Sequence, residues 1–144
     1  MIIEKELSYT IVGCGLQAYN ELGFGYDEKI YGRALDFLLV EKGLVVEREV
    51  PVNVMFRGVV IGKYRIDRVV ESRICLELKA TEQLAKIAHQ QVRSYLKASG
   101  YKLGLIMHFG ARFSSHRVLA PWLLQTPTHP SSNSSDSSDS YEQL

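Results

Sequence analysis

The stretch IGKYRIDRVVESRICLELKA, residues 61–80, contains the features that decide the fold. β-Branched and aromatic residues fill two arms, and polar residues around Ser72 separate them, which predicts a β-hairpin. The arms also contain Asp67, Glu77 and Lys79 in an otherwise apolar setting. Because side chains alternate between the two faces of a strand, Glu77 and Lys79 are expected to share one face.

The length of the turn decides whether the two carboxylates of this hairpin lie together. A three-residue loop at residues 71–73 places Asp67 directly opposite Glu77. A two-residue loop places Asp67 opposite Leu76 and turns the two carboxylates to opposite faces of the sheet. The register of the hairpin therefore determines its chemistry.

Two carboxylates that face each other across a strand pair repel, and this repulsion destabilises the pair. A hard cation such as Mg²⁺ removes the repulsion and commonly binds one or two carboxylates together with waters and substrate phosphate. Lys79 would then lie where it can offset negative charge on a phosphate oxygen. The alternative is that Asp67 and Glu77 lie on the hydrated face of an antiparallel sheet, with Lys79 as a cross-strand partner. This stretch alone leaves both interpretations open.

Composition restricts the class of protein. At 144 residues, with 46% hydrophobic and 23% charged residues, the chain has the length and composition of one ordinary globular domain. Its 17 basic and 16 acidic residues nearly balance. If the protein binds nucleic acid, it is therefore expected to do so through a local groove and not through a global positive field.

The two cysteines, Cys14 and Cys75, lie in apolar surroundings and have no CxxC spacing. This pattern predicts buried thiols in a reducing compartment, without a zinc site or a disulfide framework. The sequence contains neither a signal peptide nor an apolar run of membrane-spanning length. A cytoplasmic location and no membrane partner are therefore expected.

The remaining periodicity predicts helices and strands in an order typical of an α/β fold. The expected architecture is a mixed central β-sheet flanked by helices. Residues 1–120 are predicted to form one domain, and the Ser-rich residues 121–144 a disordered tail. Helices are predicted over residues 4–22, 27–42 and 82–98, strands over residues 44–50, 52–60 and 101–109, a turn at Arg57-Gly58, and a short strand or turn within residues 112–122.

Several motifs in this order resemble those of a known family. Residues 25–31, GYDEKIY, fit GxxExxY, the signature of the GxxExxY protein family, which resembles the PD-(D/E)XK nuclease superfamily. Asp67 followed by ELK at residues 77–79 fits the D…ExK core of that superfamily, and residues 91–95 fit its QxxxY helix motif. Ile66 stands where the name-giving motif has Pro. The resemblance covers nearly all of the chain outside the tail.

The resemblance implies a restriction-endonuclease-like core and a metal-dependent nuclease that cleaves DNA or RNA. By this resemblance Asp67, Glu77 and Glu28 would bind Mg²⁺ or Mn²⁺. Lys79 would position or deprotonate the attacking water, or stabilise the transition state. Gln91 would hydrogen-bond into the site from the third helix.

Tyr31, Arg65 and Tyr95 are the candidate substrate contacts. Each site residue also has a purely structural interpretation. Tyr31 and Tyr95 are typical of core aromatics with a polar tip, and Arg65 of a solvated surface. Glu28 suits the first turn of a helix, and Gln91 could be a hydrogen-bonded core amide.

Two other functions are consistent with the same residues. A catalytically inactive nuclease fold would bind nucleic acid or a protein partner without cleavage, which the modest net charge favours. A structural or oligomerisation domain would leave the carboxylates incidental. Nothing in the sequence shows an interface, so the homodimer common among such nucleases remains an open expectation.

Overall fold

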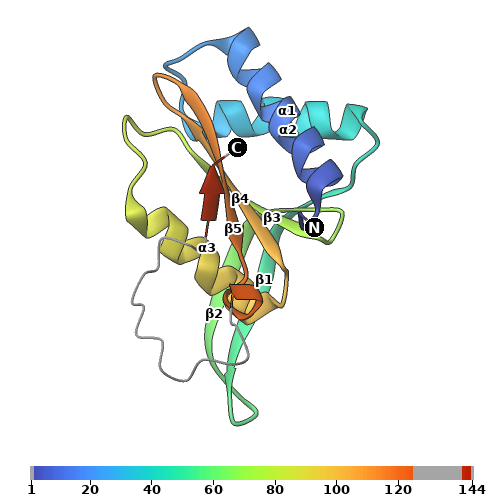
Figure 1. Cartoon of the computed structure of the whole chain (residues 1–144), viewed down its shortest axis with the longest axis vertical. Helices are drawn as coiled ribbons and strands as arrows, with labels where there is room; N and C mark the ends of the chain where they lie inside the picture. The colour runs from blue at the N-terminus through green and yellow to red at the C-terminus, as the bar shows by residue number, and fades with distance from the viewer. Residues whose placement is uncertain (1, 125–140, 144) are drawn as a thin grey trace.

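In the computed structural model, residues 2–124 and 141–143 are described, and their helices and strands form one α/β arrangement (Figure 1). Two helices precede a run of strands, and a third helix connects two strands of the same sheet. The helices are α1 Lys5–Leu22, α2 Glu28–Glu41, α3 Lys86–Ser99 and the short 3-10 helix η1 Pro121–Leu124, and the strands are β1 Val46–Phe56, β2 Val59–Val70, β3 Ile74–Lys79, β4 Leu103–Phe109, β5 Phe113–Leu119 and β6 Tyr141–Gln143.

The strands of the described residues form one mixed sheet of six, in the order β1-β2-β3-β4-β5-β6. Strands β3 and β4 are parallel, whereas the other neighbouring pairs are antiparallel. Antiparallel strands can be joined by short turns, but a parallel pair needs a crossover connection, which α3 provides here. The predicted α/β fold with a mixed central sheet flanked by helices is thus confirmed.

The two faces of the sheet bury separate hydrophobic clusters. Helices α1 and α2 pack on one face, where Ile11 and Leu35 join Leu76 of β3 in the larger cluster. Helix α3 packs on the other face, where Val92 joins Cys75 of β3. Consecutive residues of β3 therefore lie in different clusters, as the alternation of a strand buried on both faces requires.

The central hairpin has the longer of the two predicted turns. Val70 pairs with Ile74 across β2 and β3, which leaves residues 71–73 as a three-residue loop. Continuing this register along both strands brings Asp67 opposite Glu77. The two-residue turn, which would have placed Asp67 opposite Leu76, is therefore excluded.

The prediction of two strands separated by Pro51 was wrong. Pro51 lies inside β1, which continues to Phe56 before the predicted turn at Arg57 and Gly58. Strand β1 is the first strand in the sheet order and therefore an edge strand. A proline is tolerated there because its missing N–H faces solvent instead of a neighbouring strand. The result is a long β1–β2 hairpin that projects from the body of the protein (Figure 1).

Two other boundaries differ from the predicted ones. Helix α3 begins at Lys86, later than residue 82, because the residues before it form a turn in which Thr81 Oγ1 donates to the Gln83 carbonyl at 2.7 Å. Within the predicted tail, residues 121–124 form η1 and residues 141–143 pair with β5 as β6. The rest of the tail, residues 125–140 and 144, lies outside the described residues.

Candidate active site

Glu77 and Lys79 form the centre of the candidate site on β3. They occupy alternate positions of the strand and therefore share the face covered by α3. Lys79 Nζ lies 3.1 Å from Glu77 Oε2. Glu77 is 9% exposed, so this ion pair is largely removed from water. A buried carboxylate next to an ammonium group is an arrangement that costs desolvation energy.

The environment of Glu77 favours its protonated form. Burial raises the pKa of Glu77, the neighbouring Lys79 ammonium opposes this rise, and the negative charges of Glu28 and Asp67 add to it. The effect of Glu28 and Asp67 shows that carboxylates from three separate segments lie close enough to repel one another. A cation placed among them would relieve this repulsion.

Glu28 joins the cluster from the first turn of α2. Asp27 caps this helix, because its carboxylate accepts a hydrogen bond from the Ile30 N–H at 3.3 Å. The Glu28 side chain is exposed overall, yet partial desolvation of its carboxyl raises its pKa. Lys79 lowers this pKa, whereas Asp67 raises it further. The structure therefore brings the four predicted charged residues of the site into one electrostatic group.

Asp67 lies where the pairing of β1 with β2 is interrupted. The pairs on either side, Arg48–Arg68 and Val50–Ile66, are formed, but Glu49 is not paired with Asp67. Glu49 has a φ of 53°, a left-handed conformation that interrupts the ladder at this point. The side chain of Asp67 is 39% exposed.

Two guanidinium groups bind the carboxylate of Asp67. Arg68 Nη1 donates a short hydrogen bond to Asp67 Oδ2, and Arg48 Nη2 lies 3.3 Å from Asp67 Oδ1. Both arginines also bind Asp36 of α2. Arg68 donates to its two oxygens at 2.7 and 3.0 Å, and Arg48 Nη1 lies 3.3 Å from Oδ2. These four residues form a charged network that we call the Arg68 network.

The Arg68 network was not predicted from the sequence. Arg68 is 4% exposed, and its guanidinium lies against Gly32, where an added Cβ would come within 2.5 Å of Nη2. Gly32 and Asp36 are one helical turn apart on α2 and so share one face. Two features of the sequence could have identified this network. Arg68 is a charged residue directly before the apolar pair Val69-Val70, and Gly32 and Asp36 have the four-residue spacing that leaves room for a long side chain next to a carboxylate.

The donor chemistry of the site fits a hard divalent cation, but the side chains do not surround one position. Carboxylate oxygens are the ligands that Mg²⁺ takes in proteins. Among residues 2–124 and 141–143, no three His, Cys, Asp or Glu side chains converge closely enough to hold a metal ion. The carboxylate of Asp67 contacts Arg48 and Arg68 instead of meeting Glu77. Occupation by a cation would therefore compete with the Arg68 network.

Helix α3 adds two predicted residues beside Glu77. Tyr95 is 6% exposed, and burial together with the charge of Glu77 raises its pKa to about 12. A hydrogen bond with Gln91 partly offsets this rise. The ring of Tyr95 meets that of Tyr64 edge to face, with centroids 5.4 Å apart. Gln91 and Tyr95 thus border the carboxylate cluster on the α3 side.

The two remaining predicted substrate contacts lie elsewhere. Tyr31 is fully buried, stacks on Phe109 with ring centroids 4.5 Å apart, and donates its hydroxyl to the Gly23 carbonyl at 2.5 Å. In the structure Tyr31 therefore packs as a core aromatic with a hydrogen-bonded hydroxyl, which was the structural interpretation of this residue. The Arg65 side chain is 70% exposed and lies 3.6 Å from Glu49, outside the carboxylate cluster.

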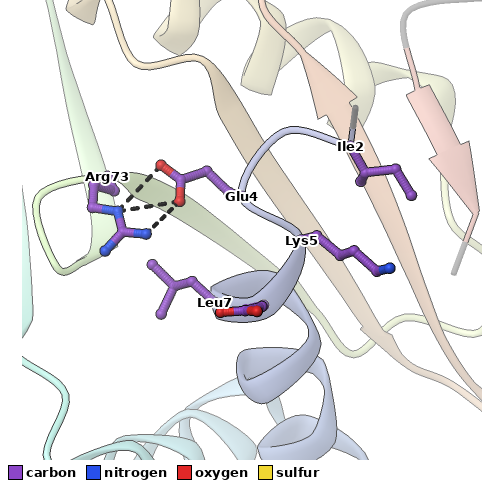
Figure 2. A pocket seen from close by; sticks show the side chains of 6 residues that line it. Ile2, Glu4, Lys5, Leu7 and Arg73 are labelled. Carbon is purple, nitrogen blue, oxygen red and sulfur yellow. Dashed lines mark hydrogen bonds and ion pairs between the residues drawn. The ribbon is translucent and has the colours of Figure 1, made fainter.

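A separate depression lies at the turn end of the central hairpin and contains none of the predicted site residues. It has a volume of about 620 Å³ between the start of α1 and Arg73 (Figure 2). Arg73 binds Glu4 through both Nε and Nη2, with a shortest contact of 2.5 Å. This contact fastens the beginning of α1 to the hairpin.

Comparison with known proteins assigns the chain to a superfamily. The chain matches the family model described as the PD-(D/E)XK nuclease superfamily over residues 5–118, and it belongs to this superfamily. A solved structure described as "Crystal structure of SSO0001" is similar, with 21% identity and a TM-score of 0.49 over 82% of this chain. The match covers 58% of that protein, less than two thirds of its length. A search of the curated proteins gave no significant match. Among the described residues, none of the helices is long and apolar enough to span a membrane.

Proposed function

We propose that the protein is a metal-dependent nuclease that hydrolyses phosphodiester bonds of DNA or RNA. The observation that supports this proposal is the electrostatic cluster of Glu28, Asp67, Glu77 and Lys79, drawn from α2, β2 and β3. Membership of the nuclease superfamily supports the same class of reaction. Purely structural carboxylates would gain nothing from sharing a partly desolvated site in which their charges repel.

Asp67 and Glu77 would hold the Mg²⁺ or Mn²⁺ ion, with Glu28 as a third ligand directly or through water. The bound ion would polarise the scissile phosphodiester and lower the pKa of a bound water. In the structure Asp67 is bound by Arg48 and Arg68, so metal binding requires its carboxylate to share or exchange these partners. A carboxylate has about four acceptor positions, which allows one side chain to serve both groups.

Lys79 would stabilise the charge that develops during hydrolysis. Its ammonium group lies 3.1 Å from Glu77 Oε2, so a phosphate oxygen bound at the metal would lie close to this positive charge. Gln91 would orient the hydroxyl of Tyr95, since the two side chains are hydrogen-bonded. Tyr95 would remain a neutral donor because its pKa is raised to about 12.

The proposal is tested by cleavage of plasmid DNA and of labelled single strands in Mg²⁺ or Mn²⁺. Asp67→Asn is expected to abolish cleavage, and Lys79→Met to lower the rate by at least about 100-fold, as loss of a charge-stabilising group does. Lys102→Met removes the same charge from an exposed position and should retain the rate of the unmodified protein. Equal activity in all four proteins would indicate a contaminating nuclease and refute the proposal.

The second candidate is an inactive nuclease fold that binds nucleic acid or a protein partner. The observation that favours it is that Arg48 and Arg68 already neutralise Asp67. In this case the protein would show salt-sensitive binding of nucleic acid without turnover in any divalent metal. Titration calorimetry separates the two, since the nuclease requires Mg²⁺ or Mn²⁺ binding that Asp67→Asn weakens.

A further inference from the structure

A second pocket, which we call the hairpin pocket, lies between the β1–β2 hairpin and α3. It has a volume of about 410 Å³ and is lined by Asn53, Met55, Tyr64, Ser94 and Lys97, together with smaller apolar side chains. No proposed metal ligand belongs to it. Its volume lies within the range of about 300–1,000 Å³ that is typical of small-molecule sites.

The hairpin pocket combines an aromatic surface with neutral polar groups and a cation. Tyr64 is 39% exposed and Met55 53% exposed, so both side chains are open to a ligand. Asn53 and Ser94 supply hydrogen-bonding groups, and Lys97 supplies a positive charge on α3. None of the described residues that line the pocket is acidic. An anionic ligand with an aromatic group would satisfy all of these features.

Two tyrosines connect the hairpin pocket with the carboxylate cluster. The ring of Tyr64 meets Tyr95 at 5.4 Å, and Tyr95 lies near enough to Glu77 for the carboxylate to raise its pKa. Tyr64 precedes Asp67 by three residues on β2, a distance of roughly 10 Å along an extended strand. This distance is roughly that of three stacked bases. A nucleic acid strand at the cluster would therefore reach the pocket within a few nucleotides.

We propose that the hairpin pocket binds an unpaired nucleotide of a single-stranded nucleic acid, and this inference rests on the proposed nuclease function. The base would stack on Tyr64 beside Met55, and the phosphate would contact Lys97. A base inside a duplex has both faces stacked on its neighbours, whereas an unpaired base can turn onto an aromatic side chain. The pocket thus selects a single strand or a frayed end over intact duplex.

The test is fluorescence anisotropy with a labelled 12-nucleotide oligothymidylate, in EDTA so that no cleavage occurs. Tyr64→Ala is expected to weaken binding by between about fivefold and a hundredfold, the range for loss of one base stack. Tyr64→Phe keeps the ring and should bind as the unmodified protein does. Lys97→Ala is expected to reduce the slope of log affinity against log salt by about 0.7, the value for one single-strand phosphate contact.

Lys102→Ala is the matched control, because it removes the same charge outside the pocket. Its salt slope should remain that of the unmodified protein. Circular dichroism checks that Tyr64→Ala is folded, and Lys97→Ala tests the pocket without truncating Tyr64. Binding unchanged in Tyr64→Ala, equal salt slopes for Lys97→Ala and Lys102→Ala, or tighter binding of a 12-base-pair duplex would each overturn the inference.

The experiments distinguish failure of the pocket inference from failure of the nuclease proposal. If Tyr64→Ala binds weakly but the unmodified protein cleaves nothing in Mg²⁺ or Mn²⁺, the pocket is a nucleotide site and the nuclease proposal fails. If the protein cleaves and Tyr64→Ala binds and cleaves equally well, the nuclease proposal stands and the pocket inference fails.

Discussion

The two faces of the sheet treat charge in different ways. On the face covered by α2, the buried guanidinium of Arg68 is matched by the carboxylates of Asp36 and Asp67. On the face covered by α3, Glu77 is paired with Lys79 but repelled by other carboxylates, and its pKa is raised. The first arrangement is electrostatically satisfied, whereas the second has an excess of negative charge. The repelling carboxylates are Asp67 of the Arg68 network and Glu28 of α2, so the candidate site lies where these two arrangements meet.

Glycines show the same contrast in packing. On the α2 face, a Cβ at Gly32 would meet Arg68 Nη2 at 2.5 Å, the end of a long polar side chain. On the α3 face, a Cβ at Gly104 of β4 would meet Val92 Cγ1 at 2.4 Å. Each helix thus approaches the sheet closely because a side chain is missing, but only the α2 contact is made by a charged group.

The largest expected effect comes from breaking the balanced face. Asp36→Ala removes the carboxylate that binds Arg68 through two oxygens and leaves a guanidinium that is 4% exposed. Loss of one partner of a buried ion pair costs about 3–5 kcal/mol. Because Asp36 is 25% exposed and Asp67 remains, we expect a loss of about 2–3 kcal/mol in the free energy of unfolding. Urea denaturation followed by circular dichroism measures it.

The double variant shows whether charge or packing causes this loss. Arg68→Met in the Asp36→Ala background removes the uncompensated charge and should recover part of the stability, since an apolar side chain of similar length fills the space. Glu41→Ala on the exposed end of the same helix should change stability by less than about 0.5 kcal/mol. A double variant less stable than Asp36→Ala alone would show that the charge is not the cause.

A smaller effect is expected from the apolar contact of the α3 face. Gly104→Ala places a methyl group 2.4 Å from Val92 Cγ1 and 3.0 Å from Cys75 Sγ. Overpacking of this kind costs about 1–3 kcal/mol. We expect Gly104→Ala to lower the free energy of unfolding by about 2 kcal/mol, measured by thermal denaturation.

Val92→Ala provides the test of this explanation, because it removes the atom that the new methyl group would meet. The double variant should lose less stability than the sum of the two single variants. Gly13→Ala on the exposed side of α1 is the control, since no atom lies within 4 Å of the added Cβ. Simple additivity of Gly104→Ala and Val92→Ala would mean that the two positions do not collide.

Much of the fold could be predicted because it depends on local patterns. The β-branched arms around residues 71–73 specified the central hairpin, and the 3.6-residue periodicity specified the three helices. The error at Pro51 had a physical cause. Whether a proline ends a strand depends on whether its N–H position faces a neighbour, and the sequence does not reveal which strand lies at the edge.

The site could be predicted where its residues belong to one hairpin. The three-residue turn gives the strand register in which Asp67 and Glu77 were predicted to face each other, and Lys79 follows Glu77 by alternation. The partners of Asp67 were missed because they depend on how α2 packs on the sheet and on the left-handed conformation of Glu49. No local pattern encodes either feature, so the prediction of a carboxylate open to metal did not include the two arginines that bind it.

The smallest effect is expected at the surface, where the central hairpin meets the start of α1 (Figure 2). The hydrogen bond from Arg73 holds the pKa of Glu4 below its usual value. The unfolded chain therefore binds a proton at Glu4 more readily than the folded protein does, so this contact stabilises the fold above a pH of about 4.5. The stabilisation is lost as the pH falls through the lowered pKa.

Glu4→Gln should accordingly reduce the thermal midpoint slightly at pH 7, and the difference from the unmodified protein should vanish in acid. It should also shrink in 1 M salt, where the Debye length is about 3 Å, because Arg73 is 52% exposed. The Asp36→Ala loss should persist in the same salt, since Arg68 is buried. Equal salt sensitivity of the two variants would contradict the contrast between a surface ion pair and the buried Arg68 network, because screening acts on charges that water surrounds.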